Sequence, residues 1–123
     1  MILVDTSVWI NHLRHGDITL TNLLNAGQVY VHPFVVGELA LGNLRQREDI
    51  LDILNNMPRS KIATDEEVMV LINQSKLYGL GIGYIDTHLL ASTRLTPGSF
   101  LWTLDKRLRA VANQLRLLAT LGR

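Results

Sequence analysis

Hydrophobic residues in this chain fall into short continuous runs and into longer stretches with helical spacing. The short runs predict five β-strands, at residues 2–4, 28–32, 61–63, 100–103 and 116–119. The longer stretches predict seven helices, at residues 7–14, 20–26, 34–44, 47–56, 66–78, 87–95 and 106–115. Because the two kinds of segment alternate, the pattern predicts an α/β fold in which helices cover a parallel sheet.

Turn and cap residues support several of these boundaries. Thr64 followed by Glu67 is the sequence of a capping box, and Pro33 suits the first turn of a helix. The glycine-rich segment 79–83 follows a predicted helix instead of a strand, and it lacks the Lys of a phosphate-binding loop. We therefore interpret it as a hinge leading to Asp86.

Length and composition narrow the class of protein. With 123 residues, 47% of them hydrophobic, the chain can form one core, and we expect a single domain over residues 1–123. The N-terminal apolar run is too short for a signal peptide or a membrane span, which favours a cytoplasmic protein. A net charge of +1 gives no general attraction for nucleic acid, so any RNA binding must depend on local charge. Because cysteine is absent, a metal would need oxygen or imidazole ligands, which favours hard cations such as Mg²⁺ or Mn²⁺.

Four acidic residues lie in apolar surroundings. Asp5 follows the first predicted strand and Asp105 follows the strand at 100–103, so both should lie beyond the carboxyl ends of strands, where α/β sheets bind ligands. Glu38 lies in an apolar helical stretch with no Lys or Arg within six positions, and Asp86 begins another such stretch. Burying an unpaired carboxylate is costly. We therefore infer that a metal ion holds these acids together.

Each acid also has a simpler interpretation. Asp5, Asp86 and Asp105 could each cap a helix N-terminus, and Glu38 could face solvent. The remaining acids serve as a comparison, because they look like ordinary solvated residues: Asp17, Glu48, Asp49, Asp52, Asp65, Glu66 and Glu67. Since four acids share the unusual setting, the metal-site interpretation is favoured over four separate coincidences.

Other residues with possible chemistry are interpreted as structural. His12 and His15 lie three positions apart on a predicted helix but have no third ligand nearby, so we expect surface or half-buried histidines. His88 shares a helix with Asp86 and could support it, although packing is the favoured role. Three aromatic residues in apolar runs are expected in the core: Trp9, Trp102 and Phe34.

The four acids lie in four segments that resemble the four motif blocks of PIN domains: 4–10, 36–42, 85–92 and 101–108. The order and spacing of these segments match VapC-type toxins best. The resemblance covers essentially the whole chain. It implies a PIN-like fold, a five-stranded parallel sheet flanked by helices in an α/β/α sandwich. It also implies that Asp5, Glu38, Asp86 and Asp105 form a catalytic pocket that holds one or two Mg²⁺ or Mn²⁺ ions.

The same resemblance implies supporting groups and partners. Thr103, with Thr6 or Ser7, would supply hydroxyl groups that support the pocket or contact phosphate. VapC-type toxins pair with a small VapB-like antitoxin that blocks the pocket, and they form homodimers, so both partners are expected. Some relatives carry a further acid where this chain has Lys106 and Arg107, which leaves the second metal position open.

The expected reaction is hydrolysis of an RNA phosphodiester by metal-activated water, with Asp5 and Asp86 as the main direct ligands. Basic residues near the motifs are candidates for holding the RNA backbone, although each could instead lie on a solvated helix face: Arg14, Arg45, Lys106 and Arg107.

Three other functions stay open. A PIN nuclease could process RNA without an antitoxin. A phosphatase-like domain with an acidic Mg²⁺ pocket would need an Asp nucleophile beside a Lys, which only Asp105 and Lys106 provide. A non-enzymatic binding module is the third, and the presence of all four acids argues against it.

Overall fold

The computed structural model describes residues 1–121, and its centre is a small parallel sheet. The sheet contains β1 (Ile2–Val4), β2 (Val29–Tyr30) and β3 (Phe100–Trp102) in the order β2-β1-β3. Ile2 pairs with Val29 on one side and with Phe100 on the other. The strand order therefore reverses beside β1, and in such sheets ligands bind at the carboxyl edge near this point.

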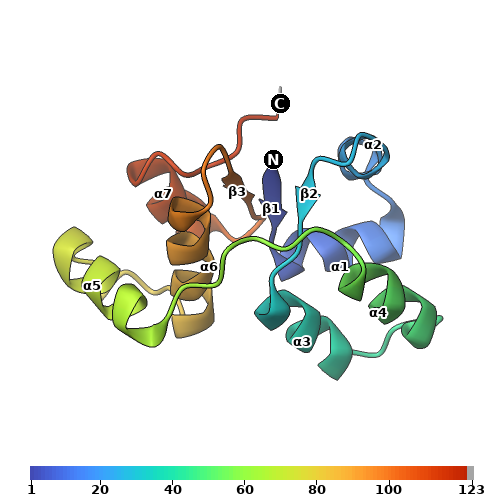
Figure 1. Cartoon of the computed structure of the whole chain (residues 1–123), viewed down its shortest axis with the longest axis horizontal. Helices are drawn as coiled ribbons and strands as arrows, with labels where there is room; N and C mark the ends of the chain where they lie inside the picture. The colour runs from blue at the N-terminus through green and yellow to red at the C-terminus, as the bar shows by residue number, and fades with distance from the viewer. Residues whose placement is uncertain (122–123) are drawn as a thin grey trace.

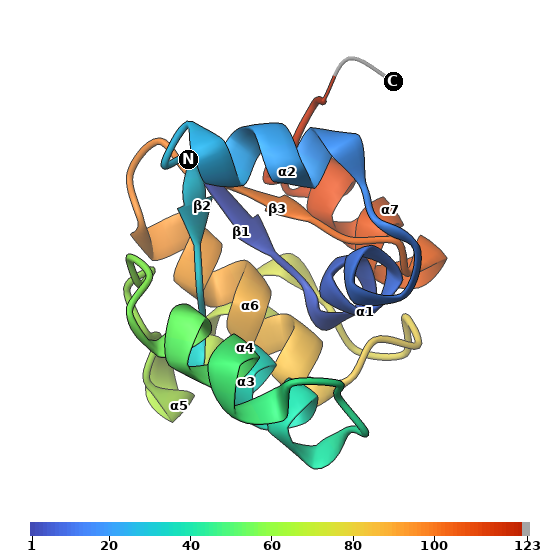
Figure 2. The same ribbon diagram turned by 90° about the vertical axis from the view of Figure 1, so that its right-hand side faces the viewer.

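Helices cover the sheet on both sides. Within residues 1–121 they are α1 (Thr6–His15), α2 (Ile18–Asn25), α3 (Pro33–Leu41), α4 (Arg47–Asn55), α5 (Asp65–Ser75), α6 (Tyr84–Leu95) and α7 (Lys106–Gln114). Figure 1 shows α1 to α4 on one side of the strands and α5 to α7 on the other, as expected for an α/β/α arrangement. Figure 2 shows β1 running toward α1 and β2 toward α3. All seven predicted helices are present, each end within three residues of its predicted position.

The prediction of five strands is wrong, because the described residues form three. Residues 61–63 form no strand, since the amides of Lys61 and Ala63 bond to side chains of α6 and its C-cap residue instead of to a neighbouring strand. The Lys61 N–H donates to Thr96 Oγ1 (3.0 Å) and the Ala63 N–H donates to Ser92 Oγ (3.1 Å). A strand-like sequence is therefore held extended by a helix.

At each edge of the sheet the described residues form one isolated bridge in place of a further strand. Val31 bridges to Arg59 beside β2, and Leu101 bridges to Leu118 beside β3, both in parallel orientation. Arg116, where the fifth strand was predicted to begin, has a φ of 60°. This left-handed conformation is incompatible with a strand.

Local sequence features were better predictors than strand patterns. Thr64 and Glu67 form both hydrogen bonds of the capping box, and Pro33 begins α3. Trp9 and Trp102 are buried as predicted. Phe34 is not a core residue, because it is 37% exposed at the start of α3. No helix within residues 1–121 has the length and apolar character needed to cross a bilayer.

Candidate active site

Asp5 is fixed by hydroxyl and amide donors at the carboxyl end of β1. Its side chain is only 5% exposed. Oδ1 accepts from the Thr6 N–H (2.8 Å), and Oδ2 accepts from Ser7 Oγ (2.8 Å) and Thr103 Oγ1 (2.7 Å). Ser7 and Thr103 therefore lie where the family resemblance implied, in direct support of this acid.

The turn between β3 and α7 brings Asp105 to the same edge. The Asp5 N–H donates to the Trp102 carbonyl (2.9 Å), which joins the ends of β1 and β3. Thr103 Oγ1, already bonded to Asp5, accepts from the Asp105 N–H (3.1 Å). Asp105 Oδ1 in turn caps α7 by accepting from two amides of its first turn (3.0 Å each). Two acids one hundred residues apart thus share one hydrogen-bonded turn.

Glu38 reaches this edge from α3. It is exposed, and its Oε1 accepts from Thr6 Oγ1 (2.7 Å). Because Thr6 directly follows Asp5, this bond brings the Glu38 carboxylate next to the end of β1. All of the hydroxyl residues expected from the resemblance, Thr6, Ser7 and Thr103, therefore contact an acid of the predicted pocket.

Asp86 completes the group from the first turn of α6. It is half-buried, and its Oδ2 accepts from the Gly83 N–H (3.1 Å). Burial raises the pKa of Asp86, the Gly83 bond opposes the shift, and the negative charges of Asp5, Asp105 and Glu38 raise the pKa further. Asp86 is therefore close enough to the other three acids to be affected by their charges.

The capping interpretation is correct for Asp5 and Asp105, which are the N-caps of α1 and α7. Asp86 is not an N-cap, because Gly83 holds that position and Asp86, in the first turn of α6, accepts from the Gly83 N–H. Capping and convergence are compatible, because a cap bond occupies one oxygen and cancels no charge. Within residues 1–121, no Lys or Arg side chain forms a salt bridge with any of the four acids.

These residues fit a hard divalent cation by the chemistry of their donors. Carboxylate oxygens are the preferred ligands of Mg²⁺ and Mn²⁺, and a cation would relieve the repulsion felt by Asp86. The described side chains do not form a ready-made metal cluster, since among residues 1–121 no three His, Asp or Glu groups are placed to hold one ion. Glu38 Oε2, Asp86 Oδ1 and Asp105 Oδ2 have no hydrogen bond within the described residues. Asp5 Oδ1 accepts a single hydrogen bond, so it too keeps a lone pair for a cation.

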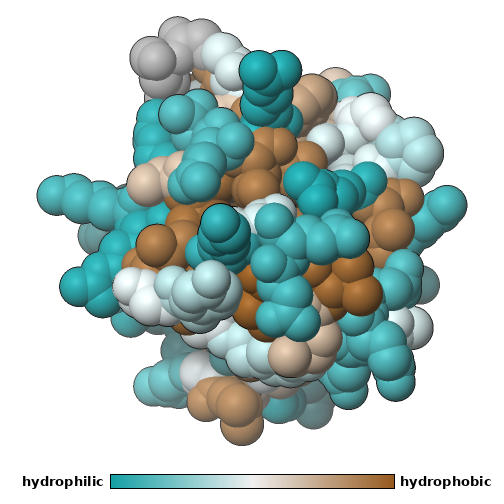
Figure 3. Space-filling view, turned by 90° about the vertical axis from the view of Figure 1, so that its left-hand side faces the viewer, coloured by the Kyte–Doolittle hydropathy of each residue, from teal (hydrophilic) through white to brown (hydrophobic). Residues whose placement is uncertain are grey.

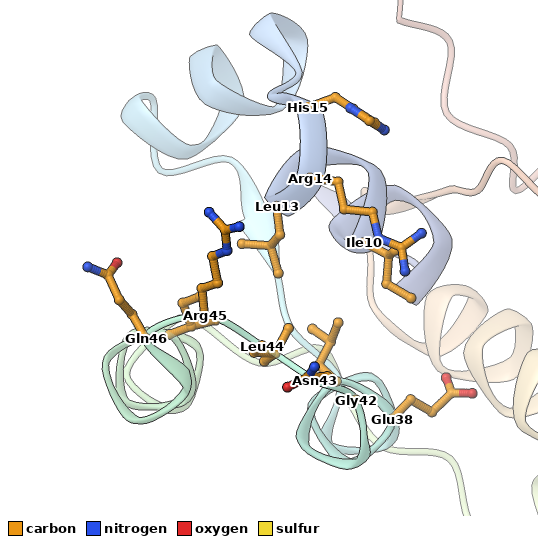
Figure 4. A pocket seen from close by; sticks show the side chains of 12 residues that line it. Ile10, Leu13, Arg14, His15, Glu38, Gly42, Asn43, Leu44, Arg45 and Gln46 are labelled. Atoms are coloured by element: carbon orange, nitrogen blue, oxygen red, sulfur yellow. The ribbon is translucent and has the colours of Figure 1, made fainter.

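The basic candidates lie in two places around the acids. Arg14 and Arg45 line a hollow of about 620 Å³ between α1 and the segment that joins α3 to α4. Figure 4 shows Arg14 and Glu38 at one end of this hollow and Arg45 at the other. Arg107, on α7, lies against Gly81, and Lys106 is exposed at the start of the same helix.

Asp65 is a residue whose role the sequence did not indicate. We expected an ordinary solvated acid, but its Oδ1 accepts from Tyr84 Oη (2.8 Å) and lies 3.0 Å from His88 Nε2. His88 is buried, so its predicted packing role is correct but incomplete. No local pattern links Asp65 to a histidine 23 positions later, and Asp65 resembles its acidic neighbours in the first turn of α5.

The N-terminal histidines lie at or near the surface of α1. His12 is half-buried, and its Nδ1 accepts from the Asp17 N–H (2.9 Å), while His15 is exposed. Both agree with the structural interpretation drawn from the sequence.

Comparisons with known proteins agree with this arrangement. The family model described as PIN domain matches residues 2–114. The protein named Ribonuclease VapC32 from Mycobacterium tuberculosis, in strains CDC 1551 / Oshkosh and ATCC 25618 / H37Rv, is 48% identical over 110 residues, which is 89% of each chain. These matches confirm the resemblance to PIN domains and VapC-type ribonucleases, and the range of the family model contains all four acids. The chain belongs to the PIN domain family.

Proposed function

We propose that this chain is a metal-dependent endoribonuclease that hydrolyses RNA phosphodiesters and acts as the toxin of a type II VapBC pair. The observation that carries the proposal is the placement of Asp5, Glu38, Asp86 and Asp105 at one edge of the sheet, without a salt bridge to Lys or Arg in residues 1–121. Such a group binds cations in preference to remaining unpaired. Similarity to Ribonuclease VapC32 supports RNA as the substrate.

In this proposal Asp5 and Asp86 are direct metal ligands, and Glu38 and Asp105 bind directly or through water. A bound Mg²⁺ or Mn²⁺ supplies an activated water and neutralises charge on the phosphate. Ser7 and Thr103 keep the Asp5 carboxylate oriented. The protein's contribution is therefore to hold four acids in place by neutral donors.

We propose that Arg107 and Lys106 hold the RNA backbone next to the acids. Both lie in the first turn of α7, directly after Asp105. Neither forms a salt bridge within residues 1–121, so both charges are available to phosphate. Because the net charge of the whole chain is only +1, this local placement matters more than the overall field.

We propose that a VapB-like antitoxin binds the hollow between α1 and α3. Ile10, Leu13 and Leu44 give it an apolar lining, and Glu38 lies at its edge. A segment bound there would cover one acid of the site and could place a basic side chain among the others. The proposal predicts that Leu13→Asp escapes inhibition by the antitoxin while its cleavage of RNA is unchanged.

We propose that a second copy of the chain binds the face formed by α5 and α6. Figure 3, which views the molecule from the side that carries α5, shows apolar surface among hydrophilic side chains. A hollow of about 290 Å³ on this face has both apolar and charged residues: Val70, Leu71, Ala91, Leu95, Glu66, Glu67 and Arg94. In a two-fold dimer the acids of one copy can face Arg94 of the other. Sedimentation should show a dimer that Val70→Asp disrupts and that Ile53→Asp, on exposed α4 surface, leaves intact.

The nuclease proposal is tested by incubating the purified protein with total RNA in Mn²⁺, with and without chelator, and mapping the new ends. Asp5→Asn should lose at least about 100-fold in rate. Asp52→Asn, an exposed acid on α4, is the matched control and should cleave at the wild-type rate. Cleavage in excess chelator, or by Asp5→Asn at the wild-type rate, would contradict the mechanism.

The phosphatase alternative is less well supported. Its nucleophile would be Asp105, whose Oδ1 already accepts from two amides as the cap of α7. Hydrolysis of a small phosphomonoester at a rate comparable with RNA cleavage would favour it.

A further inference from the structure

Asp65, which is not one of the four acids of the candidate site, bonds to two side chains in the first two turns of α6. Its Oδ1 accepts from Tyr84 Oη (2.8 Å) and bonds to His88 Nε2 (3.0 Å). Tyr84 and His88 lie on either side of Asp86 in sequence, and their rings meet edge to face with centroids 4.9 Å apart. His88 Nδ1 has no partner within residues 1–121, so Asp65 is the polar group that holds this buried ring.

The same cluster continues to α3, the helix that carries Glu38. The Phe34 ring packs edge to face on His88, with centroids 4.8 Å apart, and on His32, with centroids 5.1 Å apart. His32 caps α3 through Nδ1, and its Nε2 bonds to Ser92 Oγ on α6 (3.1 Å). Two contacts, Phe34 with His88 and His32 with Ser92, therefore join the helices of Glu38 and Asp86.

We propose that the cluster of Asp65, Tyr84, His88 and Phe34 is a positioning device that sets Asp86 relative to Glu38 for a shared divalent cation. This inference rests on the proposed function, because it assumes that the acids bind a cation. Asp86 lies in the first turn of α6, and the hydrogen bonds and ring contacts that fix this turn come from residues outside the acidic group. A solvated acid in the first turn of a helix needs no side-chain partner. Asp65 Oδ1 nevertheless bonds to two side chains, Tyr84 and His88, that flank Asp86 in sequence.

The experiment measures Mn²⁺ affinity by calorimetry, with the melting temperature of each metal-free protein recorded alongside. Asp65→Ala removes the shared acceptor and should weaken Mn²⁺ binding about tenfold, the lower end of the range for groups that orient metal ligands. Asp65→Asn keeps an acceptor oxygen and should restore affinity to within about threefold of wild type. Asp52→Ala removes a charge at an exposed position of α4, away from the cluster, and it should bind Mn²⁺ as wild type does.

The outcomes separate this inference from the proposed function. A wild-type protein that binds no Mn²⁺ overturns both. Wild-type binding combined with equal affinity in Asp65→Ala and Asp52→Ala overturns the positioning role alone. A loss in Asp65→Ala that Asp65→Asn fails to restore, and that follows the melting temperature, shows a purely structural cluster and also overturns it.

Discussion

The hydroxyl of Thr103 offers the sharpest test of how the acidic group is held. Thr103 is fully buried, donates to Asp5 Oδ2 at 2.7 Å and accepts from the Asp105 N–H at 3.1 Å. Valine has nearly the same shape and lacks the hydroxyl, so Thr103→Val removes both bonds without leaving a cavity.

The expected cost follows from the two bonds. A hydrogen bond to a buried carboxylate contributes about 1.5–3 kcal/mol, and the bond from a backbone amide contributes about 1 kcal/mol. Thr103→Val should therefore lower the free energy of unfolding by about 2–4 kcal/mol, or the melting temperature by roughly 10 °C for a domain of this size. Because Asp5 loses one of its three donors, Mn²⁺ affinity should also fall about tenfold or more.

Urea unfolding at pH 7 in EDTA, followed by tryptophan fluorescence, measures the cost without metal. Thr93→Val is the matched control, since Thr93 is 1% exposed and its hydroxyl donates to the Leu89 carbonyl inside α6 (2.7 Å). That carbonyl already accepts the helical amide bond, so the control should lose less than about 1 kcal/mol. Equal losses in the two variants would refute the reasoning, because the hydroxyl of Thr103 would then contribute nothing particular to Asp5.

Three further predictions concern charge and backbone. Asp86→Asn should stabilise the metal-free protein against urea at pH 7, because the raised pKa of Asp86 means that its ionised form is disfavoured in the fold. In the wild-type protein this loss of stability should disappear as the pH falls through that pKa. The same substitution should abolish Mn²⁺ binding, because it removes a charged ligand. Burial, with a smaller effect of neighbouring cations, lowers the pKa of His32 from 6.5 to about 4. The wild-type protein should therefore lose about 3 kcal/mol of stability as the pH falls from 6.5 toward 4. His32→Asn keeps an acceptor for the cap of α3, and its stability should change less with pH. Gly81 and Gly79 both have positive φ (78° and 74°), so replacing either with Ala should lower the free energy of unfolding by about 1 kcal/mol. Only at Gly81 would the new Cβ meet the Arg107 side chain (2.7 Å), so only Gly81→Ala should weaken RNA binding in a filter assay.

The helices could be predicted from the sequence because their determinants are local. Spacing of apolar residues, the capping box at Thr64 and Pro33 at the start of α3 act within one or two turns. The outer strands could not, because a strand depends on what lies beside it. The amides of Lys61 and Ala63 donate to hydroxyl groups of α6 and its C-cap residue. These acceptors can be identified only once the position of the helix is known.

The acids of the site were predictable for a different reason. Asp5 and Asp105 follow strands, and Glu38 and Asp86 interrupt apolar stretches, so each breaks the pattern around it. Asp65 breaks no pattern, because an acid in the first turn of a helix is ordinary. Its partners come from another helix, which is why its role emerged only from the structure.

The donors that hold the four acids explain why stability and cation binding should fall together when a donor is removed and should change in opposite directions when a charge is removed. Hydroxyls and amides orient Asp5, Glu38, Asp86 and Asp105, whereas no Lys or Arg does so within residues 1–121. A salt bridge would stabilise the metal-free fold, but it would also cancel the charge that attracts a cation. Neutral donors fix direction and leave the charge in place, so burial and, to a smaller extent, the charges of the other acids raise the pKa of Asp86. Removing a donor at Thr103 should therefore weaken both fold and site, while removing a charge at Asp86 should strengthen the fold and destroy the site.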